Sequence, residues 1–278
     1  MIPPIASQFV AGETPAEALE HARSLNDDGI VPILNLLGEH YEEPEPAAAD
    51  TQSYVQLIDD IADAEAEACI SVKPSQIGLD VDEGVFRENL RNIAEHGANR
   101  DVFVWVDMED HTTTDATLNA YEEFVHEHDG NMGLCLQANL ERTPDDVARL
   151  SDAPGKIRLV KGAYDEPESV AYQRKERVDE AYADLIETAF AEYGDGIAIG
   201  SHDPEMIDLA IELGEEHDVE VEIQMLMGVR EDAQRELAAD YQTYQYVPYG
   251  DKWLSYFYRR VMERKENLLF AARAVLGR

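Results

Sequence analysis

Short runs of β-forming residues alternate along this chain with longer amphipathic stretches, and this alternation limits the folds that the chain can adopt. The candidate strands are GIVPILNLL (29–37), ACISV (68–72), DVFVWV (101–106), MGLCLQ (132–137), KIRLV (156–160), GIAIG (196–200), VEVEIQ (219–224) and YQYVP (244–248). Apolar residues three and four apart mark helices between them. Strands that alternate with helices indicate a parallel sheet. Eight such units in about 250 residues predict an α/β protein with a (βα)8 barrel.

Further elements are expected outside the strand–helix repeat. An N-terminal helix should lie within residues 12–29, and a final helix that includes YFYRRVME (256–263) should cover the C-terminal rim of the barrel. The helices after the fourth and seventh strands are expected to be short. The stretch YEEPEPAAADTQ (41–52) is interpreted as an acidic loop rich in Pro and Ala. The whole chain, residues 1–278, is predicted to be one domain.

Charge restricts the partners of this chain. Its 22 Lys and Arg residues face 59 Asp and Glu residues, and the formal net charge is −37. This excess argues against binding nucleic acid or an anionic membrane through bulk electrostatics. Self-repulsion of the compact state is weaker in concentrated salt. We therefore expect a halophilic protein from a cytoplasm rich in salt.

Cysteine usage and hydropathy indicate the cell compartment. Cys69 and Cys135 each lie inside an apolar run, which is typical of buried free thiols in a reducing compartment. No run of about 18 apolar residues is present, and the N-terminus lacks the pattern of a signal peptide. A cytoplasmic location is expected, with at most peripheral contact at the inner face of the membrane.

Polar residues recur where the predicted strands end, which is where active sites gather in this fold. They are Lys73, Asp107, Glu109, Gln137, Arg158, Lys161, Ser201, His202, Asp203, Gln224 and Tyr246. In KIRLVKGAYDE, Arg158 and Lys161 precede small residues that allow a ligand close to the backbone. The terminal helix places Tyr256, Arg260 and Glu263 on one face with Arg259 at its margin. Paired guanidinium groups bind a carboxylate through bidentate hydrogen bonds.

Taken together, SVKPSQIGL, WVDMED, LCLQANL, RLVKGAY, IGSHD, IQMLMG, YVPYG and YFYRRVMERKEN have the order and spacing of the proline dehydrogenase family. The resemblance spans nearly the whole chain, and RLVKGAY and the paired arginines are its most specific parts. It implies a monofunctional, FAD-dependent member whose distorted barrel holds the flavin at the C-terminal rim. Asn139, Pro74 and Met227 depart from the pattern that is frequent in the family.

The resemblance also implies a role for individual residues. Asp107 and Arg158 are implied to be catalytic. The implied substrate-binding residues are Lys73, Tyr164, Leu226, Tyr246, Tyr256, Arg259 and Arg260. The implied FAD-binding residues are Met108, Gln137, Arg158, Lys161, Gly162, Ala163, Ser201, His202 and Glu263. No metal is implied.

The activity implied by the resemblance is oxidation of L-proline to Δ1-pyrroline-5-carboxylate. A hydride would pass from substrate C5 to flavin N5, and the electrons would then reach a quinone. With so acidic a surface, contact with the membrane would be transient.

Three other functions are compatible with the residues alone. Lys73 or Lys161 could form a Schiff base in a lyase of the aldolase type. A hydrolase could hold a metal with Asp107, Glu109, His202 and Asp203, although the rim lacks a second histidine. A non-catalytic binder of small carboxylates is the third alternative.

Overall fold

The computed structural model describes residue 2 and residues 6–64 and 66–258. It confirms the predicted (βα)8 barrel, since eight parallel strands close into one barrel in sequence order. The strands are β1 (Ile30–Leu36), β2 (Cys69–Val72), β3 (Val104–Val106), β4 (Met132–Gln137), β5 (Lys156–Val160), β6 (Ile197–Gly200), β7 (Val221–Leu226) and β8 (Thr243–Tyr249). The barrel closes where β1 pairs with β8, from Ile30 opposite Thr243 to Leu36 opposite Tyr249.

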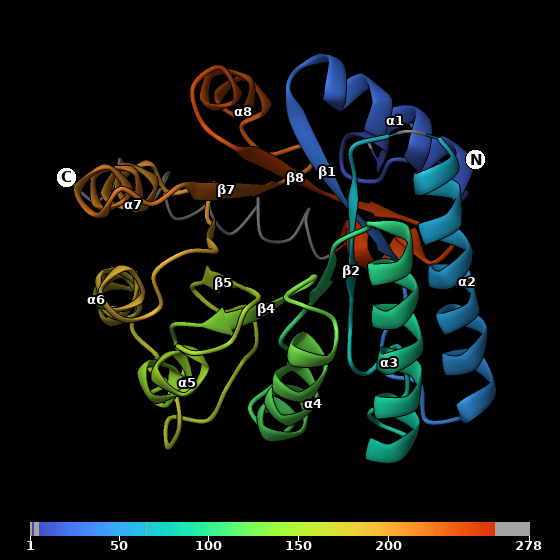
Figure 1. Ribbon diagram of the computed structural model, residues 1–278, viewed down its shortest axis with the longest axis horizontal. Coiled ribbons are helices and arrows are strands. Elements are labelled where there is room, and N and C mark those ends of the chain that lie inside the picture. The colour runs from blue at the N-terminus through green and yellow to red at the C-terminus, as the bar shows by residue number, and fades with distance from the viewer. Residues whose placement is uncertain (1, 3–5, 65, 259–278) are drawn as a thin grey trace.

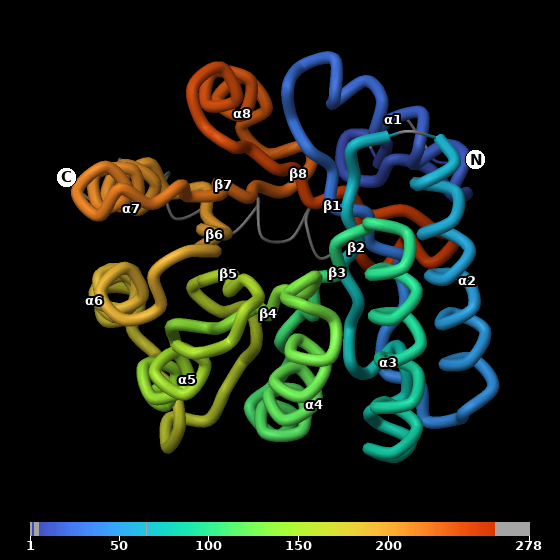
Figure 2. The backbone as a smooth tube through the Cα atoms, viewed as in Figure 1, coloured from blue at the N-terminus to red at the C-terminus, as the bar shows by residue number. Residues whose placement is uncertain are grey.

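Helices surround the strands, as Figures 1 and 2 show. They are η1 (Ala6–Gln8), α1 (Pro15–Asp27), α2 (Pro44–Asp63), α3 (Glu83–Arg100), α4 (Thr114–Glu127), α5 (Thr143–Leu150), α6 (Lys175–Glu192), α7 (Pro204–His217) and α8 (Glu231–Ala238). The N-terminal helix begins as predicted, because the Thr14 hydroxyl and the Glu17 carboxylate form a capping box. The helices after β4 and β7 are short, with eight residues each. Residues 253–258 are helical, and the rest of the predicted final helix lies outside the described residues.

The prediction of a loop at residues 41–52 was wrong, because α2 begins at Pro44. Proline is tolerated in the first helical turn, where its missing N–H would have no partner within the helix. The following alanines are strong helix formers. Ala47, Thr51 and Tyr54 then form a buried face, so residues that resemble a loop by composition belong to an amphipathic helix.

Several strand boundaries also differ from the predictions, most of them by one residue and the largest differences at β3 and β7. Strand β3 does not begin at Asp101, because Asp101 is the left-handed C-cap of α3. Strand β7 lies two residues later than expected. Tyr246 lies within β8 rather than at its end, because pairing with β1 extends that strand to Tyr249.

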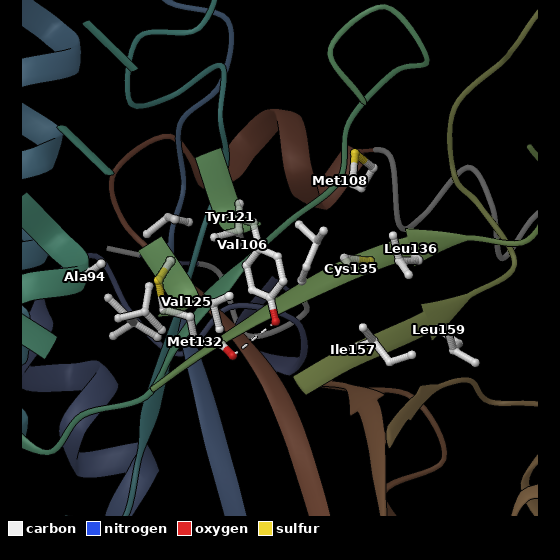
Figure 3. Packing of buried hydrophobic residues seen from close by; sticks show 14 of the residues in the cluster. Ala94, Val106, Met108, Tyr121, Val125, Met132, Cys135, Leu136, Ile157 and Leu159 are labelled. Carbon is white, nitrogen blue, oxygen red and sulfur yellow. Dashed lines mark hydrogen bonds between the residues drawn. The ribbon is translucent and has the colours of Figure 1, made fainter. Parts of the chain in front are cut away.

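The hydrophobic core has two layers, one inside the barrel and one between the strands and helices. Ile33, Cys69, Trp105 and Ala198 pack together inside the barrel. The larger outer layer includes Val106, Met132, Ile157 and Leu159 beside Tyr121 of α4, as Figure 3 shows. The Tyr121 hydroxyl donates to the Met132 and Lys156 carbonyls at 3.5 and 3.0 Å. These contacts fix the strands whose ends carry the candidate site.

Both cysteines are buried free thiols, as expected. Within the described parts of the chain, no helix combines the length and the apolar character needed to cross a membrane.

Candidate active site

Asp107 is the centre of a largely buried polar cluster at the C-terminal rim. It directly follows β3, and its Oδ1 accepts hydrogen bonds from the Ser71 hydroxyl at 2.7 Å and from the Arg158 guanidinium. Its Oδ2 accepts from the Tyr246 hydroxyl at 2.8 Å and lies 3.9 Å from Lys73 Nζ. Strands β2, β3, β5 and β8 therefore contribute to one cluster, as the rim prediction required.

Charge keeps the Asp107 carboxylate ionised. Burial alone would raise its pKa, but the neighbouring Arg158 and Lys73 cations outweigh burial and hold the pKa below its usual range. Burial and the nearby Asp107 charge raise the pKa of Tyr246 well above that of an ordinary phenol. Tyr246 therefore remains protonated and acts as the hydrogen-bond donor.

Arg158 is a fixed cation inside the barrel, with a side chain that is only 6% exposed. Its guanidinium lies 5.1 Å from the ring centre of Trp105 and 5.8 Å from that of Tyr246. Its Nη1 donates to Gln224 Oε1 at 3.3 Å. Contacts with a carboxylate, two rings and an amide fix the orientation of the guanidinium.

Lys73 lies at the same rim through a second set of hydrogen bonds. Its Nζ donates to Asn35 Oδ1 at 3.0 Å, and Asn35 Nδ2 donates to the Ser71 carbonyl at 2.9 Å. The buried Tyr54 hydroxyl also donates to that carbonyl at 3.0 Å. Strand β1 and helix α2 thus help to position the cation that the sequence analysis assigned to substrate binding.

Glu109 has a structural contact rather than a place in the Asp107 cluster. Its carboxylate accepts from the Ser75 backbone at 2.6 Å and from the Ser75 hydroxyl at 2.7 Å, and its backbone carbonyl accepts from Gln137 Nε2 at 2.7 Å. Gln137 Oε1 accepts from the Ala163 N–H at 3.4 Å. Gln137 therefore connects the loop after β3 to the segment that follows β5.

Lys161 is held by two carboxylates. Its Nζ donates to Asp179 and, at 2.8 Å, to Asp203 Oδ2. Burial alone would lower its pKa, but these hydrogen bonds outweigh burial and raise it. A Schiff-base lysine must lose its proton to become a nucleophile. The lyase alternative is therefore not favoured at Lys161.

Ser201 and His202 lie together after β6. His202 Nε2 accepts a hydrogen bond from the Leu226 N–H at 3.2 Å, which places the ring proton of the neutral imidazole on Nδ1. Ser201 Oγ accepts from the Asp203 N–H at 3.1 Å. The imidazole thus connects the loop after β6 to Leu226, the last residue of β7.

Gly162 and Asn139 form a tight contact next to Lys161, whose carbonyl accepts from the Asn139 N–H at 2.9 Å. Gly162 has a φ of +111°, and a Cβ added there would lie 2.1 Å from Asn139 Oδ1. The Asn139 side chain is buried, and its Oδ1 has no hydrogen-bond partner among the described residues. Tyr164 follows on the same segment and is half-buried. A buried acceptor without a protein partner suits a ligand that carries hydrogen-bond donors.

Two of the remaining predicted site residues lie in apolar clusters, and three lie outside the described residues. Met108 is 5% exposed and lies in the main hydrophobic cluster. Tyr256 packs with Phe9 and Leu37. Arg259, Arg260 and Glu263, which the sequence analysis assigned to the carboxylate clamp and its support, lie outside the described residues.

The carboxylates of the metal-site alternative have different partners. Asp107 contacts Arg158, Glu109 contacts Ser75, and Asp203 contacts Lys161. Over residues 6–64 and 66–258, no three His, Cys, Asp or Glu side chains are grouped as metal ligands.

Asn35, Ser71 and Trp105 belong to the site although they were not predicted from the sequence. All three are buried and contact Lys73, Asp107 or Arg158. The available signal was the two-residue period of a strand, because Ser71 and Trp105 precede Lys73 and Asp107 by two positions and so share their face.

Known proteins resemble this chain over most of its length. Residues 18–273 match the sequence model of the family described as proline dehydrogenase. The chain is 35% identical over 270 residues to proline dehydrogenase 2 of Bacillus subtilis, covering 96% of this chain and 88% of that protein. It is also 35% identical over 283 residues to proline dehydrogenase of Deinococcus radiodurans, covering 98% of this chain and 90% of that protein.

A solved structure supports the fold. The crystal structure of proline utilization A from Bdellovibrio bacteriovorus matches 93% of this chain with a TM-score of 0.85 and 24% sequence identity. This chain spans 32% of that longer chain.

Proposed function

The chain belongs to the proline dehydrogenase family of enzymes, and on that premise we propose that it oxidises L-proline to Δ1-pyrroline-5-carboxylate with FAD as cofactor. We also propose that the whole chain forms a single barrel domain. When bound, FAD would supply the two-electron acceptor, at its N5, for the hydride that leaves C5 of proline. The residues of this chain supply binding, orientation and charge.

The observation that carries the proposal is the arrangement of two cations around one carboxylate at the rim. Arg158 and Lys73 both approach Asp107, so these three groups together carry one net positive formal charge. Net positive charge favours an anionic ligand or a centre that gains electron density. A carboxylate substrate and a flavin that receives electrons both meet this requirement.

The rim also fits a flavin nucleotide. The Asn139 amide packs against the Gly162 backbone, its Oδ1 is a buried acceptor without a partner among the described residues, and Ala163 lies in the same segment. We assign Met108, Gln137, Arg158, Lys161, Gly162, Ala163, Ser201, His202 and Glu263 to FAD binding.

The substrate is proposed to bind over the Asp107 cluster. Arg259 and Arg260 would bind its carboxylate with Lys73 beside them, and Tyr164, Leu226, Tyr246 and Tyr256 would enclose the ring. The proline amine must be neutral before a hydride can leave, because an ammonium has no lone pair to donate. The cations Lys73 and Arg158 disfavour the charged amine and so favour the reactive form.

We propose a quinone as the final electron acceptor. A quinone dissolved in a membrane would require contact between this acidic protein and the membrane surface. Since anionic lipids repel a net charge of −37, we expect this contact to be brief and to strengthen with salt.

An absorption spectrum of the purified protein in concentrated salt tests the proposal. We expect a visible flavin band that bleaches when L-proline is added without oxygen. Glycine, which is an amino acid without the ring, is the control and should leave the band unchanged. If FAD does not bind after reconstitution, or if bound FAD does not respond to L-proline, the proposed activity is wrong.

A further inference from the structure

A line of polar side chains crosses the interior of the barrel from the N-terminal ends of the strands to Asp107. Lys156 and Arg158 lie two residues apart on β5, and Glu222 and Gln224 lie two residues apart on β7, so each pair shares one face of its strand. Strand β6 lies between β5 and β7, and it has Ala198 opposite both Arg158 and Glu222. The small side chain leaves room for residues of β5 and β7 to meet.

The contacts in this line are continuous. The Lys156 ammonium donates to Glu222 Oε1, and Gln224 Nε2 donates to Glu222 Oε2 at 3.1 Å. Gln224 Oε1 then accepts from Arg158 Nη1 at 3.3 Å, and Arg158 Nη2 donates to Asp107. The side chain of Glu222 is 6% exposed, whereas that of Lys156 is 34% exposed.

The side-chain amide of Gln224 is the group in this line that can adopt two orientations, which exchange its carbonyl and NH2 ends. One end of an amide donates hydrogen bonds and the other accepts them, whereas an ionised carboxylate only accepts and a guanidinium only donates. Because Glu222 requires the NH2 end of Gln224, the carbonyl end must face Arg158. With no acceptor at position 222, the amide could rotate and present its donors to a guanidinium that cannot accept them.

We propose that Glu222 is a positioning residue for the reaction, since it orients Gln224 and thereby fixes the guanidinium of Arg158 beside Asp107. This inference rests on the proposed function, which places Arg158 near the flavin. Lys156 balances the buried charge of Glu222, so Glu222 can orient the amide without adding net negative charge below the site.

The test compares Glu222→Leu with Glu222→Gln. Glu222→Leu removes the acceptor, and the Arg158 guanidinium should then lose its fixed position. We expect kcat to fall roughly tenfold to a hundredfold, because displacement of a reacting or stabilising group by about 1 Å can reduce the rate by that much. KM for proline should change less. Glu222→Gln retains a carbonyl acceptor for Gln224 and should recover most of the lost kcat.

The midpoint potential of bound FAD gives a readout that does not depend on turnover. A displaced Arg158 stabilises reduced flavin less, so the potential of Glu222→Leu should become more negative. A tenfold change in the equilibrium constant for reduction corresponds to about 30 mV for this two-electron couple.

The protein without FAD provides an independent readout. The chain has two tryptophans, and Trp253→Phe leaves Trp105, whose ring centre lies 5.1 Å from the Arg158 guanidinium, as the reporter. Fluorescence emission of Trp105 should shift when Glu222→Leu is added to Trp253→Phe.

Ile199→Val is the control because it shortens a buried side chain of β6 that packs in the cluster between strands and helices. It should lower the melting temperature without changing kcat, the midpoint potential or Trp105 emission. If Glu222→Leu fails to fold because Lys156 loses its partner, the Lys156→Met/Glu222→Leu variant removes both charges and takes its place.

The outcomes separate this inference from the proposed function. A native protein that does not react with proline would contradict the proposed function. A native protein that reacts, together with a Glu222→Leu variant whose kcat, potential and emission match those of Ile199→Val, would show that Glu222 is only structural and would overturn the inference.

Discussion

At Asp107, burial and charge act on the same carboxyl group in opposite directions, and the neighbouring cations outweigh burial. Replacement of Asp107 by Asn leaves Arg158 and Lys73 without their shared carboxylate. Removing one partner of a buried ion pair costs about 3–5 kcal/mol. We expect Asp107→Asn to lose about that much free energy of unfolding in urea titrations, and to reduce bound FAD with proline at least about tenfold more slowly.

The matched control for this prediction is Asp152→Asn, which makes the same charge change at an exposed residue. Surface substitutions usually change the free energy of unfolding by less than about 0.5 kcal/mol. Equal stability of the two variants would show that Asp107 does not stabilise the cluster.

The pKa of Glu109 is shifted in the opposite direction to that of Asp107, and stability should depend on pH as a result. Burial raises its pKa above the ordinary value of 4.5, although hydrogen bonds from Ser75 reduce the rise. A carboxyl whose folded pKa is raised favours folding most below the unfolded pKa, and this contribution is lost as pH rises through the folded pKa. The free energy of unfolding of the native protein minus that of Glu109→Gln should therefore fall as pH rises from below 4.5 through that raised pKa.

Urea titrations at a series of pH values would measure this difference. Glu187→Gln is the control, because Glu187 is exposed on α6. The difference in free energy of unfolding between the native protein and Glu187→Gln should vary less with pH. A Glu109 difference that rises with pH would mean that the buried carboxylate is stabilised by its hydrogen bonds more than it is destabilised by burial.

Among the site residues, strand ends could be predicted and their partners could not. Lys73 and Asp107 were found because they follow strands. Arg158 lies in the middle of β5 and was found because cations are rare in this chain. Asn35 contacts Lys73 from a different strand, 38 residues away in sequence. Such a contact depends on barrel closure and on side-chain direction, and neither is visible in local spacing.

For helices and strands, prediction succeeded where composition and hydrophobic periodicity indicate the same element. The ranges of β4 and β5 agree with the predicted runs. Prediction failed at residues 41–52 because composition and periodicity disagree there. The prolines lie at the start of α2, where they do little harm, and the buried face that determines the helix begins only at Ala47.

The segment after β5 allows a prediction about one of its residues. Gly162 has a positive φ, and an added Cβ would overlap the Asn139 amide. We expect Gly162→Ala to lower the free energy of unfolding by about 1–3 kcal/mol through backbone strain and to weaken FAD binding. Thermal unfolding and a fluorescence titration with FAD would measure these two effects.

Gly194→Ala is the matched control for Gly162→Ala. Gly194 also has a positive φ, of +84°, but an added Cβ would meet nothing within 4 Å. It lies in the turn before β6, at the opposite end of the barrel from the rim. Gly194→Ala should therefore lose stability without losing FAD affinity. Equal FAD affinity of the two variants would contradict the role given to Gly162.

For the whole molecule, the apolar core of the barrel favours the compact state, whereas the many acidic residues oppose it. The barrel buries two continuous apolar layers, which favours compactness in any solvent. A net charge of −37 opposes compactness, because like charges on the folded surface are closer together than in the extended chain. Stability should therefore depend on how well the solvent screens charge.

Screening makes a quantitative form of this expectation testable. The Debye length falls from about 10 Å at 0.1 M salt to about 3 Å at 1 M, so most of the repulsion between neighbouring surface charges is removed over that interval. We expect the free energy of unfolding in urea to rise steeply with KCl up to about 1 M and only slowly above it. Sucrose also favours the compact state but does not screen charge, so it should not reproduce this shape.

A variant with less surface charge separates screening from other effects of salt. Exposed acids such as Asp152, Glu187 and Glu83 can be replaced by their amides without loss of a buried contact. If repulsion governs stability, a variant that carries many such replacements should be more stable than the native protein in 0.1 M KCl and should gain less as KCl is added. An equal gain in both proteins would mean that salt acts through apolar burial, which is the same in both, and the acidic surface would then not explain the response to salt.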